Sequence, residues 1–126
     1  MDKTYGYLPT AIELMTKVET EQYDNMESAA RLMCQAILDD KLIHVFGGGG
    51  HTTLPVGEMF FRAGGLCNIN PIMETALSVF NQALKYLQLE RCENFGRAIV
   101  RYYDIQPGDV FLIFHNIGMR QQSMQP

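Results

Sequence analysis

The sequence lacks the features of several protein classes. It has no apolar run close to the roughly 20 residues that span a bilayer, and no basic cluster of the kind that binds nucleic-acid phosphates. Lys and Arg number 10 against 14 Asp and Glu, a formal net charge of −4. The first residues do not show the basic-then-apolar pattern of a secretory signal. These absences argue against membrane and nucleic-acid partners, and they predict a cytoplasmic protein.

Cysteine is also scarce. The three cysteines, Cys34, Cys67 and Cys92, lie far apart, and no CxxC pair occurs. The histidines and acidic residues show no metal-ligand spacing either. The sequence therefore supports neither a zinc site nor a disulfide framework, and it implies no metal and no cofactor. We expect the three cysteines to be buried or half-buried free thiols.

The chain has 126 residues, of which 47% are apolar and 19% charged, as in an ordinary globular domain. Residues 9–38 predict one long helix or two abutting helices, because apolar residues recur at steps of three and four. The stripe consists of Ile12, Met15, Met26, Ala30, Met33 and Ile37. Such a stripe needs a partner surface. We expect residues 1–40 to form a helical segment that packs either on the rest of the chain or on a dimer partner.

From residue 41 onward, short apolar runs alternate with helical stretches. Strands are predicted at 42–46, 66–71 and 110–114, and helices at 54–63, 75–90 and 95–103. The first apolar run, 42–46, is typical of a strand buried in a parallel sheet. Strands that alternate with helices indicate an α/β fold.

Four glycines, Gly47 to Gly50, separate the first predicted strand from the helix after it. Glycine lets the backbone approach a ligand closely, and a helix N-terminus favours a bound anion. Thr52 and Thr53 add hydroxyl donors. The alternative is a tight turn in which a threonine caps the helix. We favour the anion site, since four glycines cost backbone entropy with no expected gain in packing.

The loop does not match the nucleotide-binding motifs. His51 stands where a P-loop has lysine, and Thr52 stands at the third glycine of the dinucleotide fingerprint. A glycine loop followed by hydroxyl side chains, without lysine, suits the phosphate of a small metabolite better than a nucleotide.

Two motifs carry a resemblance to a known family. Residues 46–52 (FGGGGHT) and 57–66 (GEMFFRAGGL) resemble the sugar isomerase (SIS) domain family, and within it a bacterial subgroup of phosphosugar isomerases. The similarity extends through 68–72, 89–91, 96–98 and 108–110, and covers residues from about 10 to 118. The resemblance implies a three-layer α/β/α sandwich with a parallel, Rossmann-like sheet, a sugar-phosphate ligand, and a dimer or tetramer.

The resemblance also suggests which residues hold the phosphate. In the first loop these are Thr52 and Thr53, beside the backbone of Gly48, Gly49 and Gly50. The segment that matches the family's second loop is His115-Asn116-Ile117-Gly118, which has no serine. A phosphate role there rests on Asn116 and on backbone N–H groups such as that of Gly118.

Aldose–ketose isomerisation needs a base that moves a proton between adjacent carbons. Glu58, on the predicted helix after the loop, is one candidate; its alternative role is an ion pair with Arg62 at i+4. His51, within the loop, is the other, and its alternative role is to contact the phosphate or shape the loop. His44, inside a strand, is expected to be a hydrogen-bonded structural residue. His115 lies at a strand end, where open α/β sheets bind ligands.

Three functions remain open at this point. The first is a phosphosugar isomerase, and the second is a non-catalytic module that senses a phosphosugar. The third is an inactive fragment, because the predicted strands stop at residue 114 and residues 119–126 are polar. We expect residues 41–126 to form the N-terminal half of an SIS domain, with the sheet incomplete at the C-terminus.

Overall fold

A computed structural model describes residues 6–115 of the chain. By its internal contacts the chain divides into two compact units, Met1–Gln35 and Ala36–Pro126. The expected division at residue 40 stays a prediction. Asn116 and Gly118, expected to help hold the phosphate, lie outside the described residues.

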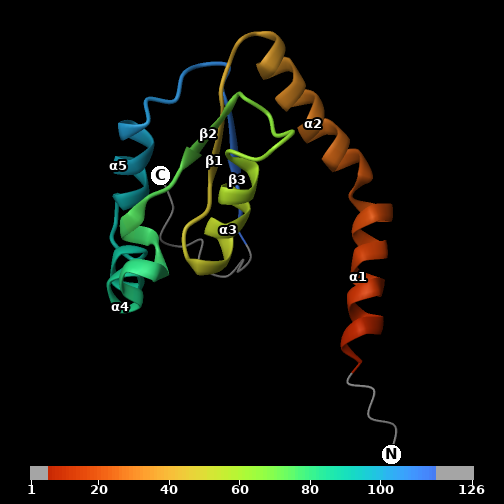
Figure 1. Ribbon diagram of the computed structural model, residues 1–126, viewed down its shortest axis with the longest axis horizontal. Helices are drawn as coiled ribbons and strands as arrows, with labels where there is room; N and C mark the ends of the chain where they lie inside the picture. The colour runs from red at the N-terminus through yellow and green to blue at the C-terminus, as the bar shows by residue number, and fades with distance from the viewer. Residues whose placement is uncertain (1–5, 116–126) are drawn as a thin grey trace, which may run out of the picture. The chain divides into compact units, whose positions relative to one another are not determined.

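Two abutting helices form the start of the described chain (Figure 1). Helix α1 spans Tyr7–Glu21 and α2 spans Tyr23–Leu38, separated at Gln22. Of the two forms that the sequence allowed, the two-helix form is confirmed. Helix α1 has no buried residue, and members of its apolar stripe such as Met15 (72% exposed) face solvent.

The second unit contains a three-stranded parallel sheet. Strands β1 (Ile43–Phe46), β2 (Ile69–Ile72) and β3 (Val110–Ile113) lie in the order β2-β1-β3. The expected α/β class with a parallel sheet is confirmed. Strand β2 begins three residues later than predicted and includes Pro71, which was expected to end it. Proline has no N–H to donate, and β2 tolerates it because it is an edge strand in the described sheet.

Helices connect the strands. They are α3 (Gly50–Met59), the 3₁₀-helix η1 (Thr75–Leu77), α4 (Val79–Leu89) and α5 (Phe95–Tyr102). Helix α3 begins four residues earlier than the sequence predicted. The predicted helix 75–90 is wrong as a single element, because Ser78 is extended and caps α4, and Gln82 (φ −164°, ψ 104°) interrupts α4.

The helices pack on both faces of the sheet. Figure 1 shows α3 on one side of the strands and α4 and α5 on the other. Val56 of α3 is fully buried, as are Ile43 and Val45 of β1. A cluster of Ile72, Leu77 and Ile99 joins β2, η1 and α5. Each fully buried side chain of this size contributes about 1.5–3 kcal/mol, so these contacts hold the layers together.

Strand β3 is only half covered, with Phe111 and Ile113 exposed, because it forms the other edge of the described sheet. One expectation about burial is wrong. The three cysteines are free but exposed rather than buried. None of the helices between residues 6 and 115 is long and apolar enough to cross a membrane.

Candidate ligand site at the carboxyl edge of the sheet

The strand order makes the connections of the strands diverge at one edge of the sheet. The chain passes from β1 to β2 on one side and then crosses to β3 on the other. Open α/β sheets bind ligands outside the carboxyl ends of their strands, where the connections diverge in this way. The N–H of Phe114 donates to the carbonyl of Phe46 (2.8 Å). The segment after β3, beginning at His115, therefore starts beside the glycine loop that follows β1.

The glycine loop has a packing role that the sequence did not reveal. Gly49 has φ 101°, which disfavours any other residue, and its N–H donates to the carbonyl of Leu77 (3.0 Å). A Cβ on Gly49 would lie 2.7 Å from the Tyr86 hydroxyl oxygen, and a Cβ on Gly47 would overlap the carbonyl of Thr52. The expectation that these glycines bring no packing gain is wrong, because the loop lies directly against η1 and α4.

The two threonines fasten the loop to the helix. Thr52 is buried, and its hydroxyl donates to the carbonyl of Gly48 (2.5 Å). The Thr53 hydroxyl donates to the carbonyls of Gly47 (3.1 Å) and Gly49. Neither threonine is the N-cap that the sequence suggested as an alternative, because both lie inside α3 and Gly49 is the N-cap.

The first turn of α3 retains backbone donors. The N–H of Thr53 already bonds to the carbonyl of Gly49 (3.1 Å). An α-helix leaves its first N–H groups without partners inside the helix, and in α3 these belong to Gly50, His51 and Thr52. The helix dipole adds partial positive charge at the same place. The start of α3 is therefore suited to an anion.

The structure separates the two candidate bases. His51 is exposed on the first turn of α3, next to the glycine loop. Glu58 lies on the last turn, about 9 Å from Thr52 along the helix axis at 1.5 Å per residue. Its carboxylate pairs with the Arg62 guanidinium (Oε2 to Nε, 3.3 Å), and both side chains are largely exposed. His51 is thus at the candidate site, whereas Glu58 makes the ion pair that was its alternative role.

In the described part of the chain, no three His, Cys, Asp or Glu side chains lie close enough together to hold a metal ion.

The family model of the SIS domain matches residues 6–124. The chain belongs to the SIS domain family.

Three bacterial proteins illustrate how this SIS chain compares with its relatives. The chain is 32% identical over 114 residues to a UPF0309 protein of Thermoanaerobacter pseudethanolicus, covering 89% of the chain and 46% of the relative. It is 35% identical over 116 residues to one of Brucella ovis, covering 92% and 48%. It is 30% identical over 112 residues to one of Geobacillus kaustophilus, covering 89% and 44%. The SIS chain thus spans somewhat less than half the length of the curated relatives it matches.

The opposite, amino edge of the SIS sheet holds a buried polar network. The Nε2 atom of His44 lies 3.0 Å from Oδ2 of Asp109, and its Nδ1 atom lies 3.0 Å from the amide nitrogen of Asn70. A carboxylate only accepts hydrogen bonds and an amide nitrogen only donates, so the imidazole proton sits on Nε2. His44 is 2% exposed. The expectation of a hydrogen-bonded structural histidine is confirmed.

Asp109 closes this network. Its carboxylate accepts from the backbone N–H of Gln106 (2.9 Å), from His44, and from the backbone N–H of Leu42 (3.1 Å). These three bonds lower the pKa of Asp109 to about 2, with the bond from Gln106 contributing most, then that from His44, then that from Leu42. Asn70 and Asp109 were not predicted from the sequence as partners of His44. The strand register brings these residues together, because Asn70 lies opposite His44 in the pairing of β1 with β2 and Asp109 directly precedes β3.

Proposed function

We propose that this SIS chain binds a phosphorylated sugar at the carboxyl edge of its sheet. The observation that carries the proposal is the glycine loop, which leads into the start of α3 where the connections of β1 and β3 diverge. Helix N-termini in this position bind phosphate through backbone N–H groups. We assign the phosphate to the backbone of Gly48 and to the N–H groups that begin α3 at Gly50, whereas Gly49, whose N–H already donates to the carbonyl of Leu77, shapes the loop.

The threonine hydroxyls shape the glycine loop and can also donate to the phosphate. Those of Thr52 and Thr53 donate to loop carbonyls, so they hold the loop in shape. A hydroxyl can rotate to redirect its proton, and a phosphate oxygen would be a stronger acceptor than a carbonyl. Asn116 and Gly118 remain proposed contributors from the segment after β3.

We further propose aldose–ketose isomerisation of the bound sugar phosphate. The reaction removes a proton from one carbon and returns it to the next through an enediol, which requires a base close to the ligand. His51 has the better position, because it is exposed beside the glycine loop, and histidine is the side chain that most often serves as a general base. Glu58 is the second candidate, since it lies at the far end of the same helix.

Deuterium exchange tests both the reaction and the base. In D₂O, proton NMR should detect deuterium entering glucose 6-phosphate, fructose 6-phosphate or a pentose 5-phosphate when the intact chain is added. We expect His51→Gln to abolish the exchange and Glu58→Gln to retain it. Loss of exchange in Glu58→Gln, but not in Arg62→Gln, would instead identify Glu58 as the base.

A binding module without turnover is the second candidate function. The distance of Glu58 from the glycine loop favours it, because only one of the two candidate bases is then near the ligand. This function predicts that sugar phosphates raise the melting temperature while no deuterium enters any of them. If no sugar phosphate changes the melting temperature or becomes labelled, both functions are wrong.

We also propose that the chain forms a homo-oligomer, a dimer or a tetramer. Several large apolar side chains of α1 are exposed, among them Leu8 (66%), Leu14 (57%) and Val18 (51%). Apolar surface of this kind is commonly covered by a protein partner. Size-exclusion chromatography with light scattering should give twice or four times the mass of one chain, and a stable monomer would contradict the proposal.

A further inference from the structure

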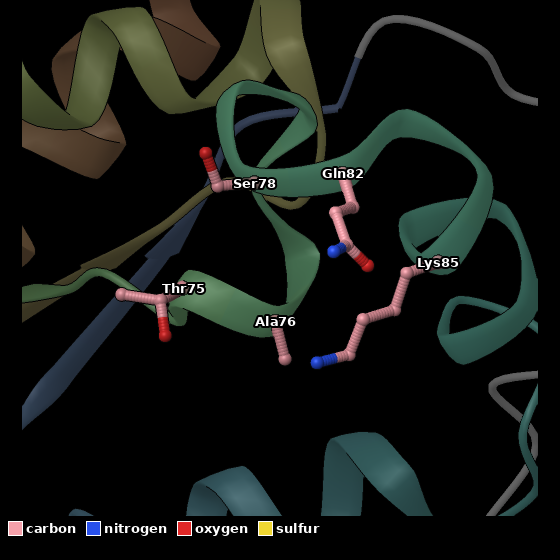
Figure 2. Close-up of a pocket in the computed structure, with 5 residues that line it drawn as sticks. All are labelled: Thr75, Ala76, Ser78, Gln82 and Lys85. Atoms are coloured by element: carbon pink, nitrogen blue, oxygen red, sulfur yellow. The ribbon is translucent and has the colours of Figure 1, made fainter.

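A small cavity lies in the segment that follows β2, outside the elements that were expected to bind phosphate. It has a volume of about 180 Å³ and opens between η1 and α4, lined by Thr75, Ala76, Ser78, Gln82 and Lys85. Figure 2 shows the Gln82 amide and the Lys85 ammonium pointing into the same space beside Ala76, whereas Ser78 points away from them. The extended backbone of Gln82 interrupts α4 at this cavity.

The cavity carries positive charge and hydrogen-bond donors. Among the described residues that line it, Lys85 is the only charged one, and none of them carries a carboxylate. Within the part of the chain that the structure describes, Lys85 makes no ion pair. The acidic residue next to the cavity in sequence is Glu74, whose carboxylate accepts a hydrogen bond from the N–H of Ala76 (2.9 Å). An anion is therefore the ligand group that this lining matches best.

The segment that lines the cavity also forms one wall of the glycine loop. Leu77 accepts the N–H of Gly49 (3.0 Å). A Cβ on Gly50 would lie 2.7 Å from a methyl group of Val79, and Tyr86 lies against Gly49. The segment formed by η1 and α4 thus contacts the glycine loop and also lines the cavity.

The glycine loop lacks one component of a strong phosphate site. It offers backbone donors and threonine hydroxyls, but His51 occupies the position where a P-loop has a lysine. Backbone donors and the helix dipole supply only about half of one positive charge, whereas a phosphomonoester carries nearly two negative charges at neutral pH. A lysine ammonium on a flexible stem would supply the missing charge.

We infer that the cavity between η1 and α4 is an anion subsite, in which Lys85 supplies the positive charge that the glycine loop lacks. The inference rests on the proposed binding of sugar phosphates, whose phosphomonoester group is the anion. The Lys85 ammonium pairs with the phosphate, and the Gln82 amide donates to an oxygen of the same ligand. No bond is made or broken in this role, so Lys85 is a binding residue.

Calorimetric titration of the intact chain with fructose 6-phosphate, inorganic phosphate and fructose tests the inference. Lys85→Met keeps the length of the side chain and removes its charge, and we expect it to weaken binding of the two phosphate compounds by about tenfold or more. Lys85→Arg should restore binding to within about threefold of wild type, since the charge returns. Lys17→Met is the matched control, because it removes the same charge from α1, and it should bind as wild type does.

The outcomes separate this inference from the proposed function. If wild type binds fructose 6-phosphate and Lys85→Met binds it equally well, the anion subsite is wrong and the proposed function stands. If only inorganic phosphate binds, and does so through Lys85, the subsite stands and the sugar ligand is wrong. If wild type binds neither phosphate compound, both are wrong. Melting temperatures of the variants should match wild type, because Lys85 is exposed.

Discussion

The two ends of the same three strands use polar groups in opposite ways. At the amino edge, the buried His44 side chain is hydrogen-bonded to both Asn70 and Asp109, and Asp109 also accepts the N–H of Leu42, directly before β1. At the carboxyl edge, the glycine loop contributes mainly backbone, and the polar side chains of His51 and Lys85 are exposed. Buried polar groups that are fully paired stabilise a fold, whereas exposed and unpaired ones are available to a ligand.

This difference follows from the direction of the strands. Because all three strands are parallel, their carboxyl ends lie at one edge, followed by the connections that diverge from β1. The amino edge is where strands enter the sheet, and side chains there are pinned by register, as in the pairing of His44 with Asn70. The amino edge thus stabilises the sheet, and the carboxyl edge is left for the proposed ligand.

Replacement of His44 should cause the largest loss of stability. His44→Ala leaves the carboxylate of Asp109 and the amide of Asn70 without their buried partner and opens a cavity, which should cost about 3 kcal/mol of unfolding free energy. His51→Ala, at the carboxyl edge, should change it by less than about 0.5 kcal/mol. Urea denaturation of the two variants measures this, and equal losses would remove the distinction between the edges.

A smaller loss of stability should follow when a glycine of the loop is replaced by a residue with a side chain. Gly49→Ala forces a strained φ and brings Cβ against the Tyr86 hydroxyl, which should cost about 2 kcal/mol. Gly64 also has a positive φ (77°) but open space around it, so Gly64→Ala should cost only about 1 kcal/mol. Tyr86→Phe should recover part of the difference in a double-mutant cycle. If the two glycine variants lose the same stability, contact with Tyr86 is not what restricts the loop.

The amino edge should also weaken in acid. The pKa of Asp109 is lowered from 3.8 to about 2 in the folded chain, so the unfolded chain binds its proton first. The stabilisation from Asp109 is therefore complete above about pH 4 and is lost as the pH falls towards 2. When the pH is lowered from about 4 towards 2 in denaturation experiments, the unfolding free energy of Asp109→Asn should therefore fall less than that of wild type. Parallel curves for the two proteins would show that Asp109 does not titrate in this way.

The smallest effect is expected for the exposed ion pair near the end of α3. Glu58 and Arg62 have side chains that are 68% and 60% exposed, and exposed pairs contribute about 0–1 kcal/mol. Glu58→Gln should therefore leave the melting temperature within about 2 °C of wild type. A larger fall in melting temperature would mean that the ion pair stabilises the fold. A loss of deuterium exchange in Glu58→Gln would then have to be compared with the exchange in Arg62→Gln, which breaks the same pair.

Sequence patterns predicted the local structure well where one segment suffices. The apolar run before Gly47 is a buried strand, and His44 within it is hydrogen-bonded as expected. Boundaries were less accurate. Thr52 and Thr53 suggested a helix that begins after them, but the helix begins at Gly50, because their hydroxyls bond to loop carbonyls.

The sequence by itself determined the order of the elements, the parallel sheet and the glycine loop, since these follow from the spacing of apolar and glycine residues along the chain. Only the tertiary structure decided which side chains meet. Asn70 and Asp109 reach His44 from 26 and 65 residues away, and Tyr86 reaches Gly49 from α4. Such contacts depend on strand register and helix packing, and no local pattern encodes them. The same register separates the paired amino edge from the open carboxyl edge.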